Sequence, residues 1–587
     1  MPPLRGAWAR DPPMLRTRGP SGPTSPPTRR SSRLVSVRAL IVVVAAAVVG
    51  VAAYKARDRV GLPHRQPHAL RITYAYSPNQ EDLLVPLIRR FNDERHRLDG
   101  RVVEIEGEAI PSGDAQTQIA KRLYRPTIWS PASSLWGRLL NYQANAQWVA
   151  DENPSLARTP LVVAMWKPEA EALGWPRRPV GFRQILRLAT SRAGWAAYGL
   201  PTFGRFKLGH TNPDFSTSGL SFVAAQYFTS TGKREGLTVA DVVRPAVRAK
   251  VRAIQQSIVH YGDTSAFFLE QLQAHGPGYV SAVAMEEVTL LEYNRTRPRG
   301  SMPLVAVYPA EGTFDFDNPL ITLRAPWVHR AQRRAAQLFI RSIVPRVTPE
   351  LAARYGYRPG DPAKRAVAPI DRAHLVDPAK PRYVLGLPEP RVLATIKTAW
   401  HADRKAANVA IVVDTSGSMN DESKLTRARQ GLLVFLRQFS PRDRVGLIGF
   451  SERAYTIVPV GELRTNRAAL RSAASTLTAA GGTAVYDATQ QGVEWIASLR
   501  DSTRINAVVV LTDGEDNASR LSASALEALL RQRAENQERN IRVFTIAYGK
   551  GANKDVLEEI AAAAGGQAYE GDPDQIVEVY REISSFF

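Results

Sequence analysis

The sequence predicts an α/β protein built from doubly wound sheets and preceded by an N-terminal transmembrane helix. From residue 69 onward, short apolar runs of strand length alternate with amphipathic runs of helical period. The 587 residues are enough for several domains, and hydrophobic and charged contents of 44% and 22% are those of globular proteins. An uncharged apolar run stands before the alternating region.

The net charge of +22 invites a nucleic-acid interpretation, but its distribution argues against one. Residues 1–65 carry twelve Lys or Arg and two acids, a net of +10 within that total. The remaining excess is spread thinly and forms no basic stripe interleaved with aromatic residues. We therefore predict no nucleic-acid partner. The absence of cysteine excludes disulfides, thiolate metal sites, a cysteine nucleophile and a lipid-modified N-terminal cysteine.

Residues 1–34 are rich in Pro, Arg, Ser and Gly without an apolar period, which predicts a disordered basic arm. Residues 35–55 predict a transmembrane anchor, because Ala39–Tyr54 is free of charge and lies between basic residues. The Arg-rich side should stay in the cytoplasm, which gives a single-pass protein of the cell membrane with its bulk extracytoplasmic. A signal peptide cleaved after Val51–Ala53 and a buried core helix are the alternatives.

Residues 69–390 mix strands and helices. The runs "LRITYAY", "RVVEIEGEA", "LVVAMW" and "PLVAVYP" predict strands, and "QEDLLVPLIRRFNDER" predicts an amphipathic helix. This alternation predicts largely parallel sheets. Residues 391–407 predict a helical linker.

Residues 408–587 show the most regular alternation in the chain. The predicted strands include "VAIVV", "RVGLIGF", "AYTIVPV", "INAVVVLTD" and "IRVFTIAYG", and helical runs separate most of them. This pattern predicts a doubly wound sheet with its ligand site at the carboxyl ends of the strands.

The stretch "NVAIVVDTSGSMN", Asn408–Asn420, suggests what that site binds. Alternate residues of an extended segment share a face, so Asp414, Ser416 and Ser418 converge. Oxygen ligands that include neutral hydroxyls suit Mg²⁺ better than Ca²⁺. Taken alone, the same pattern also fits a turn that caps the next helix.

Two further loops belong to the same predicted edge of the sheet. Thr483 follows a pair of glycines, and Asp513 ends the strand "INAVVVLTD". With these loops, residues 408–587 resemble a von Willebrand factor type A domain, and the D-x-S-x-S motif with a later Thr and Asp resembles its metal-ion-dependent adhesion site.

That resemblance implies a Mg²⁺ or Mn²⁺ site. Ser416 and Ser418 would bind the metal directly, Thr483 directly or through water, and Asp414 and Asp513 mostly through water and hydrogen bonds. It also implies a protein partner whose Asp or Glu carboxylate completes the coordination. No His, Lys or Cys base appears in the three loops, so we predict binding and no enzyme activity.

The stretch "HTNPDFSTSGL" places Ser216, Thr217 and Ser218 before an apolar helix. Hydroxyls and free N–H groups there suit an anion, and plain helix capping is an equal alternative. Together with "PTIWSPASSLWGRLL", "NPSLARTPLVVAMW", "VYPAEGTF" and "AARYGYRP", this stretch resembles the bacterial extracellular solute-binding proteins, which have two lobes that close over a ligand. The resemblance implies these residues for a small-molecule solute: Ser77, Ser112, Gly113, Ser133, Ser134, Ser216, Thr217 and Ser218.

The leading hypothesis is a membrane-anchored, extracytoplasmic binding protein that docks an acidic partner residue through Mg²⁺ and senses a small solute. The alternative is a solute receptor of an ABC-type transport system with an accessory type A domain. Assistance to an ATPase would require a cytoplasmic location, which the basic arm and the anchor argue against.

Overall fold

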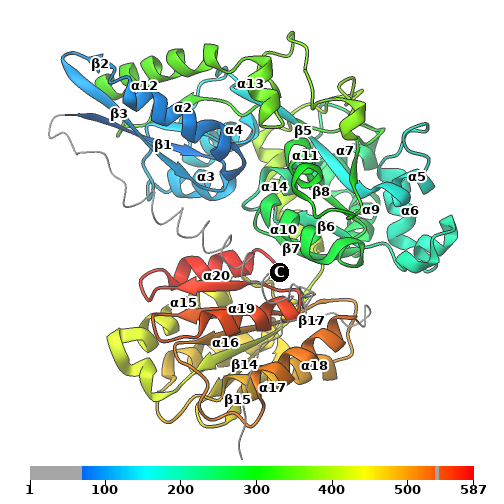
Figure 1. The fold of residues 1–587 in the computed structure, drawn as a ribbon, viewed down its shortest axis with the longest axis vertical. Coiled ribbons are helices and arrows are strands. Elements are labelled where there is room, and N and C mark those ends of the chain that lie inside the picture. Colours follow the sequence, from blue (N-terminus) through cyan, green and yellow to red (C-terminus); the bar gives the residue numbers. More distant parts are fainter. Residues whose placement is uncertain (1–68, 536–540) are drawn as a thin grey trace, which may run out of the picture. The chain divides into compact units, whose positions relative to one another are not determined.

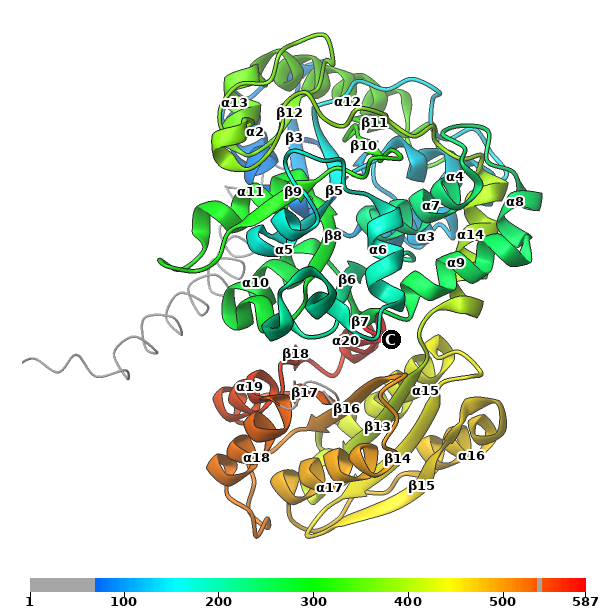
Figure 2. The same cartoon turned by 90° about the vertical axis from the view of Figure 1, so that its right-hand side faces the viewer.

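The computed structural model describes residues 69–535 and 541–587, which lie in one compact unit, His68–Phe587. The predicted arm, residues 1–34, and the predicted anchor, residues 35–55, fall outside the described residues. Within residues 69–535 and 541–587, no helix has both the length and the apolar character needed to cross a membrane. Figures 1 and 2 show the arrangement of the elements.

The first lobe is built on a sheet with the strand order β11-β4-β1-β3-β2. Strand β1 is parallel to β3 and β4, so its carboxyl end at Tyr76 lies beside Ala109 and Ser130. Helix α12 packs against β1 and α2. The strands are β1 (Leu70–Tyr76), β2 (Arg97–Leu98), β3 (Arg101–Ala109), β4 (Ile128–Ser130) and β11 (Ile321–Thr322). The helices are α2 (Glu81–Asp93), α3 (Ser112–Ala120), α4 (Ser134–Ala144), α12 (Arg330–Ile343) and α13 (Pro349–Arg354).

The second lobe has the strand order β10-β5-β8-β6-β7, with β9 and β12 also paired to β5. Its strands are β5 (Ala157–Trp166), β6 (Leu208–Thr211), β7 (Ile258–Gly262), β8 (Ala282–Glu286), β9 (Leu304–Val307), β10 (Asp315–Phe316) and β12 (Arg358–Pro359). Its helices are α5 (Lys167–Ala172), α6 (Phe182–Thr190), α7 (Thr217–Thr231), α8 (Val239–Val243), α9 (Pro245–Gln255), α10 (Ser265–His275) and α11 (Glu287–Thr296).

The sheets of the two lobes are more mixed than the sequence predicted. Strands β6, β7 and β8 are parallel to one another, but β5 runs antiparallel to β8, β9, β10 and β12. Strand β5 is buried along nearly its whole length. An apolar run of this kind predicts a buried strand but carries no information on the direction of its partners.

The C-terminal sheet has the strand order β15-β14-β13-β16-β17-β18 and is parallel except for the edge strand β15. Its strands are β13 (Ala407–Asp414), β14 (Arg444–Phe450), β15 (Ala454–Glu462), β16 (Ile505–Thr512), β17 (Ile541–Tyr548) and β18 (Ala568–Gly571). Its helices are α15 (Lys424–Gln438), α16 (Leu463–Thr476), α17 (Val485–Ser498), α18 (Ala523–Glu535), α19 (Lys554–Ala563) and α20 (Ile576–Ser584).

Alternation along β13 explains why helices cover both faces of this sheet. Val409, Ile411 and Val413 join a core cluster with residues of α15, α16 and α20, whereas Ala410 and Val412 join one with α17, α18 and α19. Successive side chains of a strand point to opposite faces. A run that is apolar at every position therefore requires a layer of helices on each side.

The segment predicted as a helical linker lies mostly in α14 (Pro390–Asp403), which packs against α4, α7, α8 and α9. Asp403 is fully buried and accepts hydrogen bonds from Arg248 and Arg252 of α9. Helix α14 is therefore part of the packed structure rather than a free tether.

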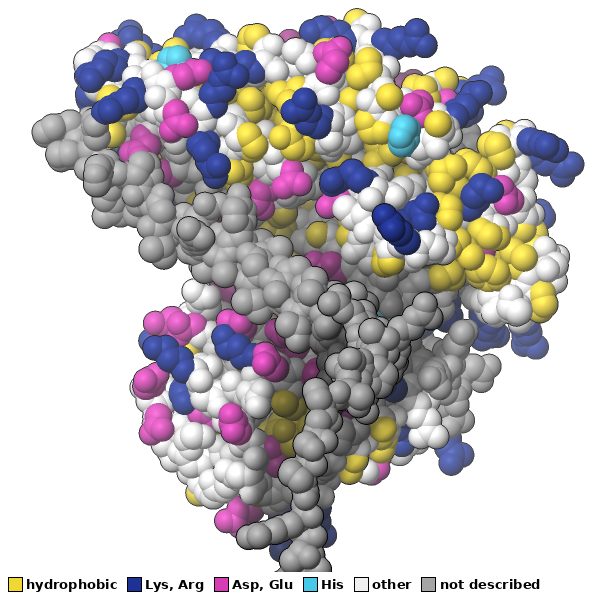
Figure 3. Space-filling view, in the orientation of Figure 1, with side chains coloured by type: hydrophobic (Ala, Val, Ile, Leu, Met, Phe, Trp, Pro, Cys, Tyr) yellow, Lys and Arg dark blue, Asp and Glu magenta, His cyan; other side chains and the backbone are white. Residues whose placement is uncertain are grey.

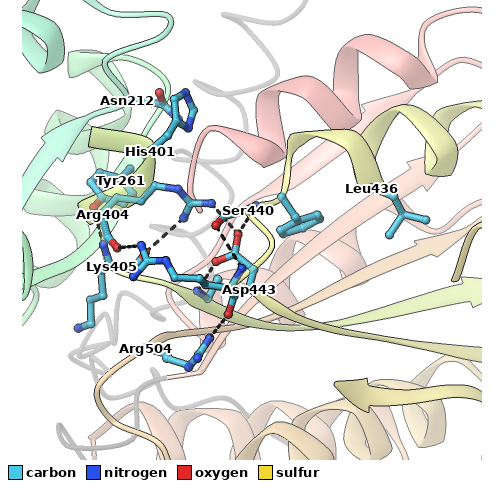
Figure 4. A network of polar contacts seen from close by, with 12 residues as sticks. Asn212, Tyr261, His401, Arg404, Lys405, Leu436, Ser440, Asp443 and Arg504 are labelled. Atoms are coloured by element: carbon cyan, nitrogen blue, oxygen red, sulfur yellow. Dashed lines mark hydrogen bonds and ion pairs between the residues drawn. The ribbon is translucent and has the colours of Figure 1, made fainter. Parts of the chain in front are cut away.

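A buried ion pair follows α14 directly (Figure 4). Arg404 donates to the Asp443 carboxylate at 2.6 Å, and Arg404 and Asp443 are 2% and 0% exposed. The other Asp443 oxygen accepts from the Ala407 N–H at the start of β13. Lys405 donates through its backbone N–H to the Tyr261 hydroxyl of β7. These contacts join the second lobe to the C-terminal sheet.

A second contact between these parts comes from the residues after α20. The Phe586 ring is fully buried, with its centroid 4.8 Å from those of Phe267 and Phe544. Asn212 of the second lobe donates through its side-chain amide to the Ser585 carbonyl oxygen.

On the face drawn in Figure 3, Lys and Arg side chains are interspersed with Asp and Glu.

We predict that Glu169→Gln changes how stability depends on pH. Glu169 is fully buried, and burial raises the pKa of its carboxyl from 4.5 to about 9, although Ser281 and Lys207 oppose the rise. A carboxyl whose pKa rises on folding stabilises the fold fully below about pH 4.5, and this contribution is lost as the pH rises toward about 9. Glutamine does not titrate. The melting temperature of the variant minus that of the wild type should therefore increase as the pH is raised from about 5 to about 9. A difference that stays constant with pH would contradict this burial effect.

Candidate functional site

The predicted metal residues come from three loops at one edge of the C-terminal sheet. Strands β13 and β16 are parallel, with Val413 opposite Leu511, so the residues that follow them leave the sheet side by side. Asp414 ends β13 and Asp513 follows β16. The third loop precedes α17 and contains Thr483. The structure thus brings the three loops together at the edge where the sequence predicted a ligand site.

Asp414 is fully buried at the base of this site. Its Oδ1 accepts from the Ser416 N–H at 2.7 Å, and its Oδ2 accepts from the Thr512 hydroxyl at 2.6 Å. Burial raises the pKa of the Asp414 carboxyl above its usual range, and the hydrogen bonds from Ser416 and Thr512 oppose the rise. Asp414 therefore fixes the start of its own loop.

Ser416, Ser418 and Asp513 form a continuous chain of oxygen atoms. The hydroxyls of Ser416 and Ser418 lie 3.0 Å apart, and Ser418 donates to Asp513 Oδ1 at 2.7 Å. Ser416 precedes the 3₁₀ helix Gly417–Ser423, which follows β13. Three of the predicted ligands are thereby linked directly.

Backbone hydrogen bonds hold the Thr483 loop against the Ser416 loop. The Gly417 N–H donates to the Gly481 carbonyl, and the Ala480 N–H donates to the Thr415 carbonyl. A Cβ at Gly514 would lie 3.6 Å from Thr483 Oγ1 and 3.8 Å from Ser418 Oγ. Both hydroxyls therefore border the space that glycine leaves open beside Asp513.

The structure adds two residues that the sequence analysis did not assign. Thr512 holds Asp414, as described above. Lys424, at the first position of α15, places its Nζ 2.7 Å from Asp513 Oδ2. The three loops contain no lysine, and Lys424 reaches the site from the helix that follows the first of them.

The donor set fits a hard divalent cation such as Mg²⁺. It combines two carboxylates with three hydroxyls, all of them oxygen donors. No group of three or more His, Cys, Asp or Glu able to hold a metal occurs within residues 69–535 and 541–587. The candidate site differs from such groups because most of its donors are hydroxyls.

Two of the neighbouring acids stabilise the rim instead of entering the site. Asp487 accepts from the backbone N–H groups of Arg520 and Leu521, and Asp516 accepts from Ser519. These hydrogen bonds shape the loop that follows Asp513.

In the lobes, most of the predicted solute residues are engaged in contacts within the protein. Ser133 caps α4 through the Leu135 N–H, and Ser134 donates through its N–H and its hydroxyl to Asp317. Ser112 accepts from the Ala132 N–H. Ser77 is 8% exposed and precedes the 3₁₀ helix Pro78–Gln80 without capping it through its side chain.

The stretch that contains Ser216, Thr217 and Ser218 contacts the first lobe directly. The Trp136 indole donates to Thr217 Oγ1 at 2.8 Å, and the Gly113 N–H donates to the Phe215 carbonyl at 2.8 Å. The Ser218 hydroxyl lies within hydrogen-bonding distance of Ser216 and of Thr211. The two lobes are therefore closed on each other at these residues.

Helix α14 adds to this closure through Asp214. Lys397 and His401 of α14 pair with the Asp214 carboxylate at 3.1 and 2.8 Å. Burial alone would raise the pKa of Asp214, but Lys397 and His401 outweigh it and hold the pKa well below its usual range. The Asp214 carboxylate thus anchors residues 210–220, which we call the predicted solute loop, to α14.

Two of the larger pockets in the described residues are lined by parts of the two lobes. One, of about 1010 Å³, is lined by residues of α4 and the start of α14 and includes Ser134 but none of the other predicted solute residues. The second, of about 650 Å³, lies between Asn79, Asp82 and α11 and contains none of them.

Two family models match the chain. The model of the bacterial extracellular solute-binding protein matches residues 72–358, and that of the von Willebrand factor type A domain matches residues 408–579. The chain therefore carries a solute-binding domain followed by a von Willebrand factor type A domain. Families of these two kinds are typically non-catalytic.

Curated relatives match only parts of the chain. The uncharacterized protein sll0103 of Synechocystis sp. is 29% identical over 198 residues, which cover 33% of this chain and 44% of that protein. Inter-alpha-trypsin inhibitor heavy chain H4 of Homo sapiens is 28% identical over 192 residues, 30% of this chain and 20% of that protein. Calcium-activated chloride channel regulator 3A-1 of Mus musculus is 32% identical over 30% of this chain and 19% of that protein. The chain spans less than half the length of each of these relatives.

Solved structures of both kinds are similar to parts of the chain. The similarity to a periplasmic thiamin binding protein covers 58% of this chain and 98% of that protein's chain, with 10% identity and a TM-score of 0.40. The similarity to a von Willebrand factor type A structure from Catenulispora acidiphila covers 31% of this chain and 42% of that protein's chain, with 23% identity and a TM-score of 0.28.

We predict that Gly113→Ala prevents the lobes of the solute-binding domain from closing in this way. A Cβ at Gly113 would lie 2.2 Å from the Asp214 carbonyl oxygen and 2.7 Å from the Trp136 ring. Overpacking of this kind costs roughly 1–3 kcal/mol. The variant should melt at a lower temperature and show a larger radius of gyration in small-angle X-ray scattering.

Gly278→Ala is the matched control, because no heavy atom lies within 4 Å of a Cβ built at Gly278. The control should keep the wild-type radius of gyration. Equal behaviour of the two variants would contradict the closed contact between the lobes.

Proposed function

We propose that the protein is a membrane-anchored, extracytoplasmic binding protein that docks an acidic residue of a partner protein through Mg²⁺ or Mn²⁺ in its type A domain. The observation that carries this proposal is the convergence of Asp414, Ser416, Ser418 and Asp513 in one hydrogen-bonded chain, with Thr483 on the adjoining loop. The matched family supports it, since type A domains commonly bind a divalent metal at such a site.

In this proposal Ser416, Ser418 and Thr483 offer hydroxyl oxygens to the metal, and the carboxylates of Asp414 and Asp513 lie behind them. When bound, the metal supplies a positive charge with a coordination position open to a further oxygen ligand. Thr512 and the Ser416 N–H keep the Asp414 carboxylate in place, so the loop needs little rearrangement. A preorganised site of this kind loses less entropy on binding.

The partner is expected to supply an Asp or Glu carboxylate. The candidate ligands are mostly neutral, so they leave a dication poorly neutralised and attractive to an external anion. Glu452 and Arg453 in the loop after β14, and Glu515 and Arg520 in the loop after Asp513, are exposed. Such a polar rim suits an interface whose energy is concentrated at one central contact.

A solute receptor of an ABC-type transport system remains the second candidate. The match of residues 72–358 to the bacterial extracellular solute-binding protein favours it. The contacts of Gly113 and Trp136 with the 215–217 stretch favour instead a domain whose two lobes are joined directly. In our proposal the solute-binding domain senses a small solute or serves as the platform that presents the type A domain.

We predict that the full chain fractionates with membranes because residues 35–55 anchor it. A variant that begins at residue 69 should be recovered in the soluble fraction, since no helix within residues 69–535 and 541–587 is suited to span a membrane. Protease added to intact cells should digest the bulk of the anchored chain. Recovery of the full chain in the soluble fraction, or its protection from the protease, would contradict the anchored topology.

We predict that the double variant Asp414→Ala, Ser416→Ala abolishes binding of Mg²⁺ and Mn²⁺. The measurement is calorimetric titration of the chain from residue 69, with circular dichroism to verify that each variant is folded. Asp421→Ala is the matched control, because it removes an exposed carboxylate from the same loop. It should bind metal as the wild type does.

The same titration is repeated with a short peptide that contains one Asp, because a weak metal site can require an added carboxylate. Binding by the wild type but not by the double variant, with or without the peptide, supports the docking site. Equal binding by the wild type and the folded double variant would refute it.

A further inference from the structure

Lys424 is a cation built into the candidate metal site. It is 9% exposed, and its Nζ lies 2.7 Å from Oδ2 of Asp513, which is itself 1% exposed. The opposite oxygen of Asp513 accepts from the Ser418 hydroxyl. One carboxylate therefore links a predicted metal ligand to a lysine.

The surroundings of Lys424 hold it in this position. The Tyr548 hydroxyl at the end of β17 donates to the Lys424 carbonyl oxygen at 2.9 Å. A Cβ at Gly549, whose φ is +80°, would lie 3.4 Å from Lys424 Cε, so the lysine side chain passes close to this glycine. Lys424 is therefore packed against the end of β17 as well as paired with Asp513.

The charges at the site follow from these contacts. With both carboxylates ionised, Asp414 and Asp513 contribute −2 and Lys424 contributes +1, which leaves −1. A bound divalent cation would change this sum to +1. Glu515 and Lys550 on the rim are exposed, so water and salt screen them far more than the buried pair.

We propose that Lys424 makes binding of the metal depend on binding of a carboxylate at the same site. The lysine lowers the affinity for the metal alone, because it neutralises Asp513 and repels a second cation. It also leaves the metal-bound site with a net positive charge, which a carboxylate of the partner compensates. The two ligands are thereby coupled, and each raises the affinity for the other by the same factor.

This inference rests on the proposed function and assigns Lys424 a specificity role within it. Lys424 does not bind the metal itself; it acts by pairing with Asp513 and through its positive charge. The coupling keeps the site weakly occupied by metal until an acidic partner arrives.

The experiment is a titration of the purified full chain with Mn²⁺, followed by electron paramagnetic resonance of the free ion. Each titration is run in sodium chloride and in sodium acetate at equal ionic strength, with acetate as the probe carboxylate. The variants are Lys424→Met, which removes the charge, and Lys424→Arg, which keeps it. Lys550→Met is the matched control, since it removes an exposed lysine from the loop that follows β17.

In chloride, Lys424→Met should bind Mn²⁺ at least about tenfold more tightly than the wild type, because a buried positive charge has been removed. Acetate should tighten Mn²⁺ binding to the wild type and to Lys424→Arg but have a much smaller effect on Lys424→Met. Lys550→Met should behave as the wild type does.

Equal or weaker Mn²⁺ binding by folded Lys424→Met would overturn the inference and leave the proposed metal site standing. The inference would also be overturned if acetate tightened Mn²⁺ binding by the same factor in the wild type and in Lys424→Met. Absence of Mn²⁺ binding in all of these proteins, with and without acetate, would instead refute the proposed function. Melting temperatures measured without metal show whether each variant is folded.

Discussion

The parallel register of β13 and β16 is the constraint on which the candidate site depends. With Val413 opposite Leu511, Asp414 and Asp513 leave the sheet at one edge, and the two loops are close enough for Ser418 to donate to Asp513. The register is fixed because residues of β13 alternate between two helical layers, so a shift by one residue would exchange the layers. The geometry of the site thus follows from the packing of the strand that carries it.

The solute-binding domain and the type A domain are joined more firmly than two modules on a tether. Helix α14 pairs with the second lobe through Asp403 and with the predicted solute loop through Lys397 and His401. Directly after it, Arg404 pairs with Asp443 of the C-terminal sheet, and Asn212 of the same solute loop bonds the Ser585 carbonyl. Movement of the solute loop would therefore strain contacts with the type A domain.

Much of the fold could be predicted from the sequence because its signals are local. Runs such as "VAIVV" and "INAVVVLTD" specify buried strands. Asp414, Ser416 and Ser418 lie together at the end of β13 as predicted, but Ser418 belongs to a 3₁₀ helix and not to an extended segment. The two family matches confirm the predicted solute-binding and type A domains. The metal and solute roles of individual residues stay predictions.

Other features depend on contacts between residues far apart in the chain. The antiparallel partners of β5 include β8 and β9, which come much later in the chain. The apolar run that forms β5 does not indicate which later strands pair with it or in which direction. Lys424 begins a helix, and only the fold shows that its side chain reaches Asp513. The contacts of Ser134 with Asp317 and of Thr217 with Trp136 also join residues far apart in the chain. Serine and threonine serve as caps and as ligands equally well, so sequence alone does not separate the two roles.

Anomalous X-ray diffraction from crystals grown with Mn²⁺ and acetate would show whether three loops of the type A domain hold a divalent metal. We expect one strong anomalous peak within coordination distance of the Ser416 and Ser418 hydroxyl oxygens, with acetate density beside it. A well-ordered site without such a peak, or a Mn²⁺ peak only elsewhere on the protein, would contradict the proposed metal site.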